Sequence, residues 1–154
     1  MRKQAVLLAL LAASFPAIGD VHLELGHNKF STTVAGKSIQ LDLEVGPPPP
    51  TGCVHWRWGA EADCPKSAVV ALTVIYRNTS LFVSRSAFAD LGAPSKLVVK
   101  PSRIGFRIEI AGGDAATSYV AVLEFVGDEL RQRRVVNPSF ANTAYEVTRF
   151  SYPQ

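Results

Sequence analysis

Alternation of apolar and polar residues is the feature that most limits what this chain can fold into. In residues 39–45 every second side chain is apolar, and residues 103–110 repeat the pattern with a charged opposite face. A period of two places successive side chains on opposite faces of a β-strand, so that one face packs in a core and the other meets water. This half-buried pattern is typical of antiparallel sheets. The chain is therefore predicted to be built from antiparallel β-strands.

The remaining segments with strand patterns are short and are separated by turn residues. They are residues 21–25, 30–34, 68–77, 96–100, 117–126, 129–136 and 144–152. Residues 68–77 are apolar on both faces, which favours a strand that is covered on both sides. The number and spacing of the segments predict an all-β fold, either a single antiparallel β-sandwich or a small, partly open barrel.

Residues 86–91 carry the only helix signal, which is one or two turns long. Ser86 is a suitable N-cap, Gly92 can adopt the left-handed conformation that ends a helix, and Pro94 cannot continue it. One short helical turn is therefore expected within the β-rich domain. A second proline, Pro101, is expected to end the strand at residues 96–100.

The first 19 residues have the pattern of a secretory signal peptide. A basic start precedes an uncharged apolar run that is too short to span a bilayer, and Ala17 and Gly19 are the small residues expected before a cleavage site. We expect residues 1–19 to be removed and residues 20–154 to form a single β-rich domain, exported to the periplasm or secreted. No transmembrane segment is expected after cleavage.

The charge of the exported domain is close to neutral. The full chain has 16 basic and 13 acidic residues and a formal net charge of +3. Loss of Arg2 and Lys3 with the signal peptide leaves 14 basic and 13 acidic residues, a net charge of +1. This balance gives no general attraction for nucleic acid, so no nucleic-acid partner is predicted.

A glycine and four prolines at residues 46–50 separate two groups of strands. Proline has no N–H for a β-ladder, and consecutive prolines favour an extended connector. Cys53 and Cys64 follow, and two cysteines in an exported chain are expected to pair with each other. Closing this loop by a disulfide is expected to stabilise the fold by about 3 kcal/mol.

The cysteine loop contains the first candidate binding residues. If the chain is extended here, Trp56 and Trp58 share one face and Arg57 lies on the other. Two neighbouring indoles would form a stacking platform for sugar rings or apolar groups, with Arg57 available for hydrogen bonds. The alternative is that the tryptophans pack against the disulfide as part of the core.

Residues 112–119 form the second candidate site. Asp114 and Ser118 could bind a ligand, or Ser118 could act as a nucleophile with His27 or His55 as its base. The alternative is that these short polar side chains cap their own turn. No G-x-S-x-G motif surrounds Ser118, and the histidines lack metal-ligand spacing, so no catalytic set, metal or cofactor is predicted.

Arg131, Arg133 and Arg134 form a basic cluster near the C-terminus. On a regular strand, Arg131 and Arg133 would share a face and Arg134 would take the other. Exposed charges on an edge strand deter association between sheet edges, which is the simpler interpretation. The alternative is a patch for an anion or an acidic partner, continued by Arg103 and Arg107.

These features favour an exported domain that acts by binding a protein or a cell-envelope glycan. The missing catalytic set argues against an enzyme, but a small secreted hydrolase that uses residues 112–119 with a histidine is the first alternative. A structural subunit of an envelope assembly is the second. The sequence leaves open the partner, the oligomeric state and the use of Asn78 as an N-glycosylation acceptor.

Overall fold

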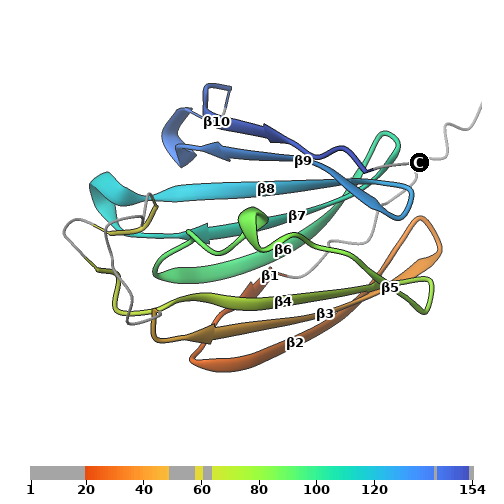
Figure 1. Cartoon of the computed structure of the whole chain (residues 1–154), viewed down its shortest axis with the longest axis horizontal. Helices are drawn as coiled ribbons and strands as arrows, with labels where there is room; N and C mark the ends of the chain where they lie inside the picture. The colour runs from red at the N-terminus through yellow and green to blue at the C-terminus, as the bar shows by residue number, and fades with distance from the viewer. Residues whose placement is uncertain (1–19, 49–57, 61–63, 141, 153–154) are drawn as a thin grey trace, which may run out of the picture.

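Two antiparallel β-sheets lie face to face and enclose a hydrophobic core (Figure 1). The computed structural model describes residues 20–48, 58–60, 64–140 and 142–152. In this part of the chain neither sheet closes on itself. The prediction of an all-β fold is confirmed, and the two-layer arrangement resembles a β-sandwich rather than a barrel.

The chain changes sheet twice, between β1 and β2 and between β5 and β6. The six-stranded sheet has the order β1-β6-β7-β8-β9-β10, and the four-stranded sheet has the order β2-β3-β4-β5. The strands of the first are β1 (Asp20–His22), β6 (Pro94–Ser102), β7 (Gly105–Gly112), β8 (Tyr119–Val126), β9 (Glu129–Val136) and β10 (Ala144–Arg149). Those of the second are β2 (Gly26–Val34), β3 (Lys37–Gly46), β4 (Ala68–Tyr76) and β5 (Thr79–Leu81).

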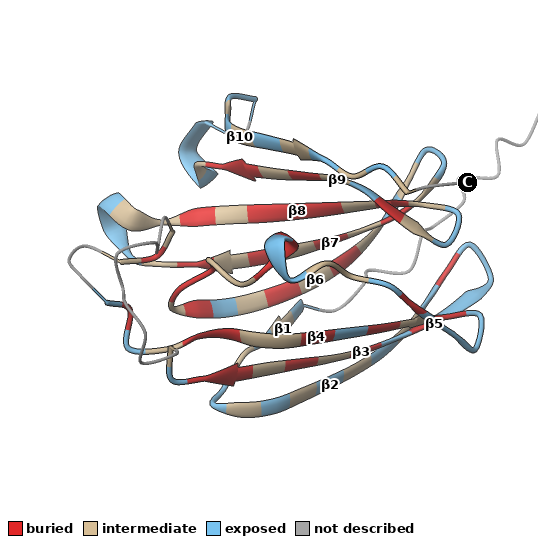
Figure 2. Cartoon of the chain, in the orientation of Figure 1, coloured by how far each residue is buried: buried red, intermediate tan, exposed pale blue. Residues whose placement is uncertain are grey.

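The alternation in the sequence produces the core as predicted. The apolar side chains of residues 39–45 are at most 4% exposed, and buried and exposed positions alternate along the strands (Figure 2). Aromatic rings join the two sheets: the ring of Tyr76 on β4 lies 5.0 Å from that of Phe106 on β7. Phe106 in turn stacks on Phe125 of β8 at 4.6 Å. Burial of these apolar faces is the main force that holds the sheets together.

Two details of the predicted strands are wrong. Ile104 is 66% exposed, because it lies in the turn between Ser102 and Gly105, which pair as the ends of β6 and β7. On β4, Thr73 is exposed and Ile75 is half-buried, so this strand is covered on its inner face only. Its outer side is open to solvent.

The prediction that Pro101 ends a strand is also wrong, because β6 continues to Ser102. Among the described residues, β1 pairs only with residues 96–98 of β6, so no described strand lies beside Pro101 on this side of β6. An edge is the place in a sheet where proline is tolerated.

The helical turn predicted at residues 86–91 is a single 3-10 turn, Arg85–Ala87. Ser84 rather than Ser86 occupies the N-cap position. The turn belongs to the segment that crosses from β5 to β6. Two further 3-10 turns lack a clear sequence signal: Ala115–Thr117 and Pro138–Phe140.

Several predictions fall outside the described residues. These are the signal peptide at residues 1–19, the last two prolines of the connector and Cys53, so the disulfide between Cys53 and Cys64 stays a prediction. Cys64 itself is exposed. In the described part of the chain, no helix is long and apolar enough to cross a membrane.

Candidate functional site

Trp58 lies at one end of the sandwich and is partly buried against the core. Its backbone forms a parallel bridge with Leu91. Its ring stacks on Tyr145 of β10, with centroids 5.8 Å apart and planes 15° from parallel. Trp56 and Arg57 lie outside the described residues, so the predicted tryptophan platform stays untested. The aromatic pair observed here is Trp58 with Tyr145.

Asp114 and Ser118 are hydrogen-bonded within their own turn. The Thr117 hydroxyl donates to the carbonyl and the carboxylate of Asp114, at 3.0 and 3.2 Å. The Ser118 hydroxyl donates to the Ala115 carbonyl at 2.9 Å. Both side chains thus cap their turn, which is the alternative to a ligand-binding role.

The histidines do not complete a catalytic group around this turn. His27 Nδ1 lies 3.0 Å from Asp42 Oδ1 on the four-stranded sheet, and His55 lies outside the described residues. Within the described ranges, no histidine hydrogen-bonds to Ser118 or Asp114. In the same ranges, no group of three or more His, Cys, Asp or Glu is arranged to hold a metal ion. The hydrolase alternative gains no support from His27.

The structure brings Trp58 and the 112–119 loop together around Gly92. The Gly92 N–H donates to the Trp58 carbonyl at 3.0 Å, and the Tyr119 hydroxyl donates to the Gly92 carbonyl at 2.9 Å. Gly92 does not adopt the predicted left-handed conformation; its neighbour Ala93 does, with φ 44°. The two candidate regions thus form one hydrogen-bonded end of the sandwich.

Tyr119 makes the stability of this end depend on pH. Its side chain is fully buried, and burial, together with the charge of Asp90, raises the pKa of its hydroxyl well above the ordinary value. The folded state keeps the neutral form, whereas the unfolded chain ionises above about pH 10. We expect this group to stabilise the fold fully below about pH 10 and progressively less above it, by up to about 1.4 kcal/mol per pH unit.

Urea titrations of the native protein and of Tyr119→Phe, from about pH 8 to about pH 11.5, test this expectation. The variant loses the hydrogen bond to Gly92, which lowers the free energy of unfolding by about 1 kcal/mol at pH 8. Above pH 10 its free energy of unfolding should fall less steeply than that of the native protein. If the free energy of unfolding falls equally steeply with pH in both proteins above pH 10, Tyr119 is not the group responsible for the pH dependence.

Arg133 turns into the core, and the prediction of an exposed edge strand is wrong. β9 lies between β8 and β10, and Arg133 is 1% exposed. The pairing of β8 with β9 shifts register beside Arg131, and this β-bulge reverses the alternation of the strand. Arg133 therefore follows Leu130 onto the inner face. Arg131 stays exposed and forms an ion pair with Glu129.

The Arg133 guanidinium fastens the 3-10 turn to the six-stranded sheet. Nη1 donates to the Ser86 carbonyl at 2.7 Å, and Nη2 donates to Asp90 Oδ2 at 2.8 Å. Glu146 Oε1 on β10 lies 3.6 Å from Nε. A buried charge requires such partners. Arg133 therefore has an internal structural role and does not contribute to an external anion site.

Arg134 and Arg107 lie on the outer face of the six-stranded sheet, where they line one shallow depression of about 460 Å³. Val120, Val122 and Val136 form its apolar floor. Glu109, Pro138 and Asn142 complete the lining. The depression thus combines an apolar floor with two guanidinium groups.

Both guanidinium groups retain hydrogen-bond donors. Arg107 Nε lies 3.0 Å from Glu109 Oε1, and Arg134 Nη2 lies 3.5 Å from Glu124 Oε1. Neither Nε atom makes a hydrogen bond within the described residues. Each side chain is 35% exposed. The two Nε atoms are buried from solvent, so the donors that can meet an arriving acceptor are those of the Nη groups.

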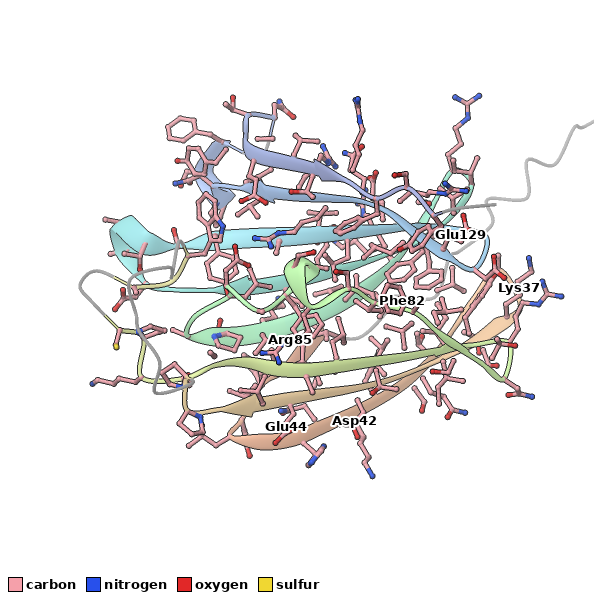
Figure 3. All side chains as sticks on the ribbon, viewed as in Figure 1. Lys37, Asp42, Glu44, Phe82, Arg85 and Glu129 are labelled. Atoms are coloured by element: carbon pink, nitrogen blue, oxygen red, sulfur yellow. The ribbon has the colours of Figure 1, made fainter. Side chains whose placement is uncertain are left out.

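Basic side chains outnumber acidic ones on this outer face. The basic residues at paired positions are Lys96, Lys100, Arg107, Arg134 and Arg149, and the acidic ones are Asp20, Glu109, Glu124 and Glu129. Lys96 pairs with Asp20, while Glu109 is shared by Lys100 and Arg107, at 2.7 and 3.0 Å. The outer face of the four-stranded sheet carries Asp42 and Glu44 (Figure 3), with Lys29 opposite Asp42. The first face therefore has a small excess of basic groups and the second a small excess of acidic ones.

Of the residues in the alternative interpretation as an anion patch, Arg134 and Arg107 lie together on this face. Arg103 is exposed in the turn between β6 and β7, and Arg133 is withdrawn into the core. The valine floor has a weak sequence signal: residues 119–123 are apolar on both faces, although their neighbours on β7 alternate.

The comparisons with known proteins found no match: no protein family, no curated protein and no solved structure matches this chain. What the chain does is therefore inferred from its own residues.

Proposed function

We propose that the chain is an exported binding domain whose outer six-stranded face recognises an acidic segment of a protein partner. One observation carries this proposal: Arg107 and Arg134 flank an apolar floor of valines in a single depression. A guanidinium group binds a carboxylate with paired N–H donors, and an apolar floor favours a ligand with short apolar side chains next to its charges.

The charge distribution supports the same proposal. The small basic excess on this face, together with Arg107 and Arg134 in the depression, favours an acidic partner over a basic one. Export follows from the pattern of residues 1–19, and a disulfide between Cys53 and Cys64 is part of the proposal. We favour a protein segment over a glycan because one ring face of Trp58, the described candidate for sugar stacking, packs against Tyr145.

We expect a labelled peptide of alternating glutamate and valine to bind the purified protein, measured by fluorescence anisotropy. Substitution of both Arg107 and Arg134 by glutamine should raise Kd at least about tenfold, since each substitution removes a charge-assisted hydrogen bond to the peptide. A peptide in which glutamine replaces glutamate should bind much more weakly. Added salt should weaken the glutamate peptide selectively.

The matched control is the double substitution of Arg103 and Arg131 by glutamine. It removes the same charge from exposed positions that do not line the depression, and its Kd should stay within about twofold of the native value. An equal loss of peptide affinity in the two double variants would mean that the attraction is non-specific, and it would contradict a site in the depression. Fragments of cell-envelope glycan, followed by tryptophan fluorescence, test the other ligand class.

A further inference from the structure

β2 is an edge strand without the usual protection against pairing. It pairs with β3 over nine residues, from Gly26 to Val34, with no shift in register. The other edges are β1 and β5, which have three residues each, and β10, whose register shifts beside Tyr145. Short strands and bulges protect edges, as do proline and lysine, and β2 contains a single lysine and no proline. In Figure 1 no described segment lies along its outer side.

The hairpin turn determines which backbone groups of β2 face outward. Ala35 and Gly36 both have positive φ, 49° and 75°, as in a two-residue turn of type I′. Such a turn is closed by a hydrogen-bonded pair, here Val34 with Lys37, and hydrogen-bonded pairs then recur at every second residue. The backbone N–H and C=O groups of the even-numbered residues, from Gly26 to Val34, therefore point toward β3. The groups at the positions between them point away from the sheet.

The outward-facing backbone groups therefore belong to His27, Lys29, Ser31 and Thr33. In the described part of the chain, no other segment hydrogen-bonds to them. We propose that this edge pairs with the same edge of a second copy of the chain. The two β2 strands would run antiparallel about a two-fold axis at Phe30, and the two four-stranded sheets would join into one continuous sheet.

The strand is complementary to itself in this register. Lys29 lies opposite Ser31 of the second copy, and His27 lies opposite Thr33, so no like charges face each other directly. On the inner face Phe30 meets Phe30 of the second copy at the axis, and aromatic cross-strand pairs are stabilising. Each outward N–H meets a C=O of the second copy, and each outward C=O meets an N–H. Such self-complementarity is the requirement for an isologous interface.

Charge substitutions at Ser31 test the proposed register. Ser31→Lys places a lysine opposite Lys29 of the second copy at two symmetric positions, and it should raise the dimer Kd roughly tenfold. Ser31→Glu should lower the Kd several-fold, because the same positions then attract. The control is Gln40→Lys, which adds the same charge to the same face on β3, beside Ser31 but away from the interface. It should leave the Kd nearly unchanged.

Sedimentation equilibrium of the purified protein, from about 1 to about 200 μM, measures these constants. Amide hydrogen exchange gives an independent readout: the Lys29 and Ser31 amides should become protected only at high concentration, while the Phe30 amide, bonded to β3, is protected throughout. A monomer over the whole range would overturn the proposal. So would equal effects of Ser31→Lys and Gln40→Lys, or protection at Lys29 and Ser31 that depends on an added acidic peptide rather than on protein concentration.

Discussion

Replacing Arg133 by alanine should lower the free energy of unfolding by about 3–5 kcal/mol, because it removes one partner of a buried ion pair. The guanidinium is 1% exposed and donates to the Ser86 carbonyl and the Asp90 carboxylate. Without it, the carboxylates of Asp90 and Glu146 lose this partner and border a cavity left by the largest fully buried side chain of the described residues. Urea denaturation at neutral pH measures the loss.

Arg131→Ala is the matched control, since it changes the same residue type on the same strand. Arg131 is exposed and its ion pair with Glu129 is solvated, so its loss should lower the free energy of unfolding by no more than about 0.5 kcal/mol. Arg133→Lys should fall between the two, because lysine keeps the charge but cannot bond Ser86 and Asp90 together. Equal losses for Arg133→Ala and Arg131→Ala would contradict the buried role of Arg133.

The substitution should also loosen a specific segment. Arg133 joins the 3-10 turn at Arg85–Ala87 to β9. The substitution should therefore increase the hydrogen-exchange rates of amides in and after that turn more than those of amides in β3 and β7. A uniform increase across the molecule would mean that the turn depends on its other contacts.

The position of Arg133 is the feature of β9 that the sequence predicted wrongly. Strict alternation along residues 129–136 places Arg133 with Arg131 and opposite Leu130, and a charged residue on an exposed face is the ordinary outcome. The bulge beside Arg131 reverses this assignment. Bulges have no simple sequence signal, and the two carboxylates that make burial acceptable come from distant segments, at Asp90 and Glu146.

The strands themselves were predictable, because each carries its own periodicity. The apolar faces of residues 39–45 and of Phe106, Ile108 and Ile110 lie in the core as the alternation requires. Ile104 fits the same pattern but lies in a turn, because the ends of a strand depend on the position of the hairpin and not on hydrophobicity.

The depression at Arg107 and Arg134 was predictable only in part. The two arginines are visible in the sequence as charges on strands, but their common location depends on the order of β7, β8 and β9 in the sheet. Arg134 pairs across the sheet with Val122, and Val122 in turn pairs with Glu109, next to Arg107 in the lining. Such pairings are non-local, and no single segment of the chain specifies them.

Gly59→Ala should lower the free energy of unfolding by about 2–4 kcal/mol, the combined effect of a strained backbone and of overpacking. Gly59 has φ 76°, a conformation that alanine adopts only at a cost. A Cβ at this position would overlap the Gly92 carbonyl oxygen and would lie 3.0 Å from the Tyr119 ring. The Gly92 carbonyl accepts the hydrogen bond from Tyr119, so the substitution also disturbs the link between these segments.

Gly127→Ala separates the two effects, because Gly127 has a similar φ of 63° but no atom within 4 Å of an added Cβ. It should lower the free energy of unfolding by about 1 kcal/mol, the effect of the backbone conformation alone. The difference between the two variants then measures how tightly Gly59 is packed against Gly92 and Tyr119. An equal loss of stability in both variants would mean that the close approach of Gly59 to Gly92 does not stabilise this end of the sandwich. The hydrogen bond from Tyr119 to Gly92 would then be the contact that stabilises it.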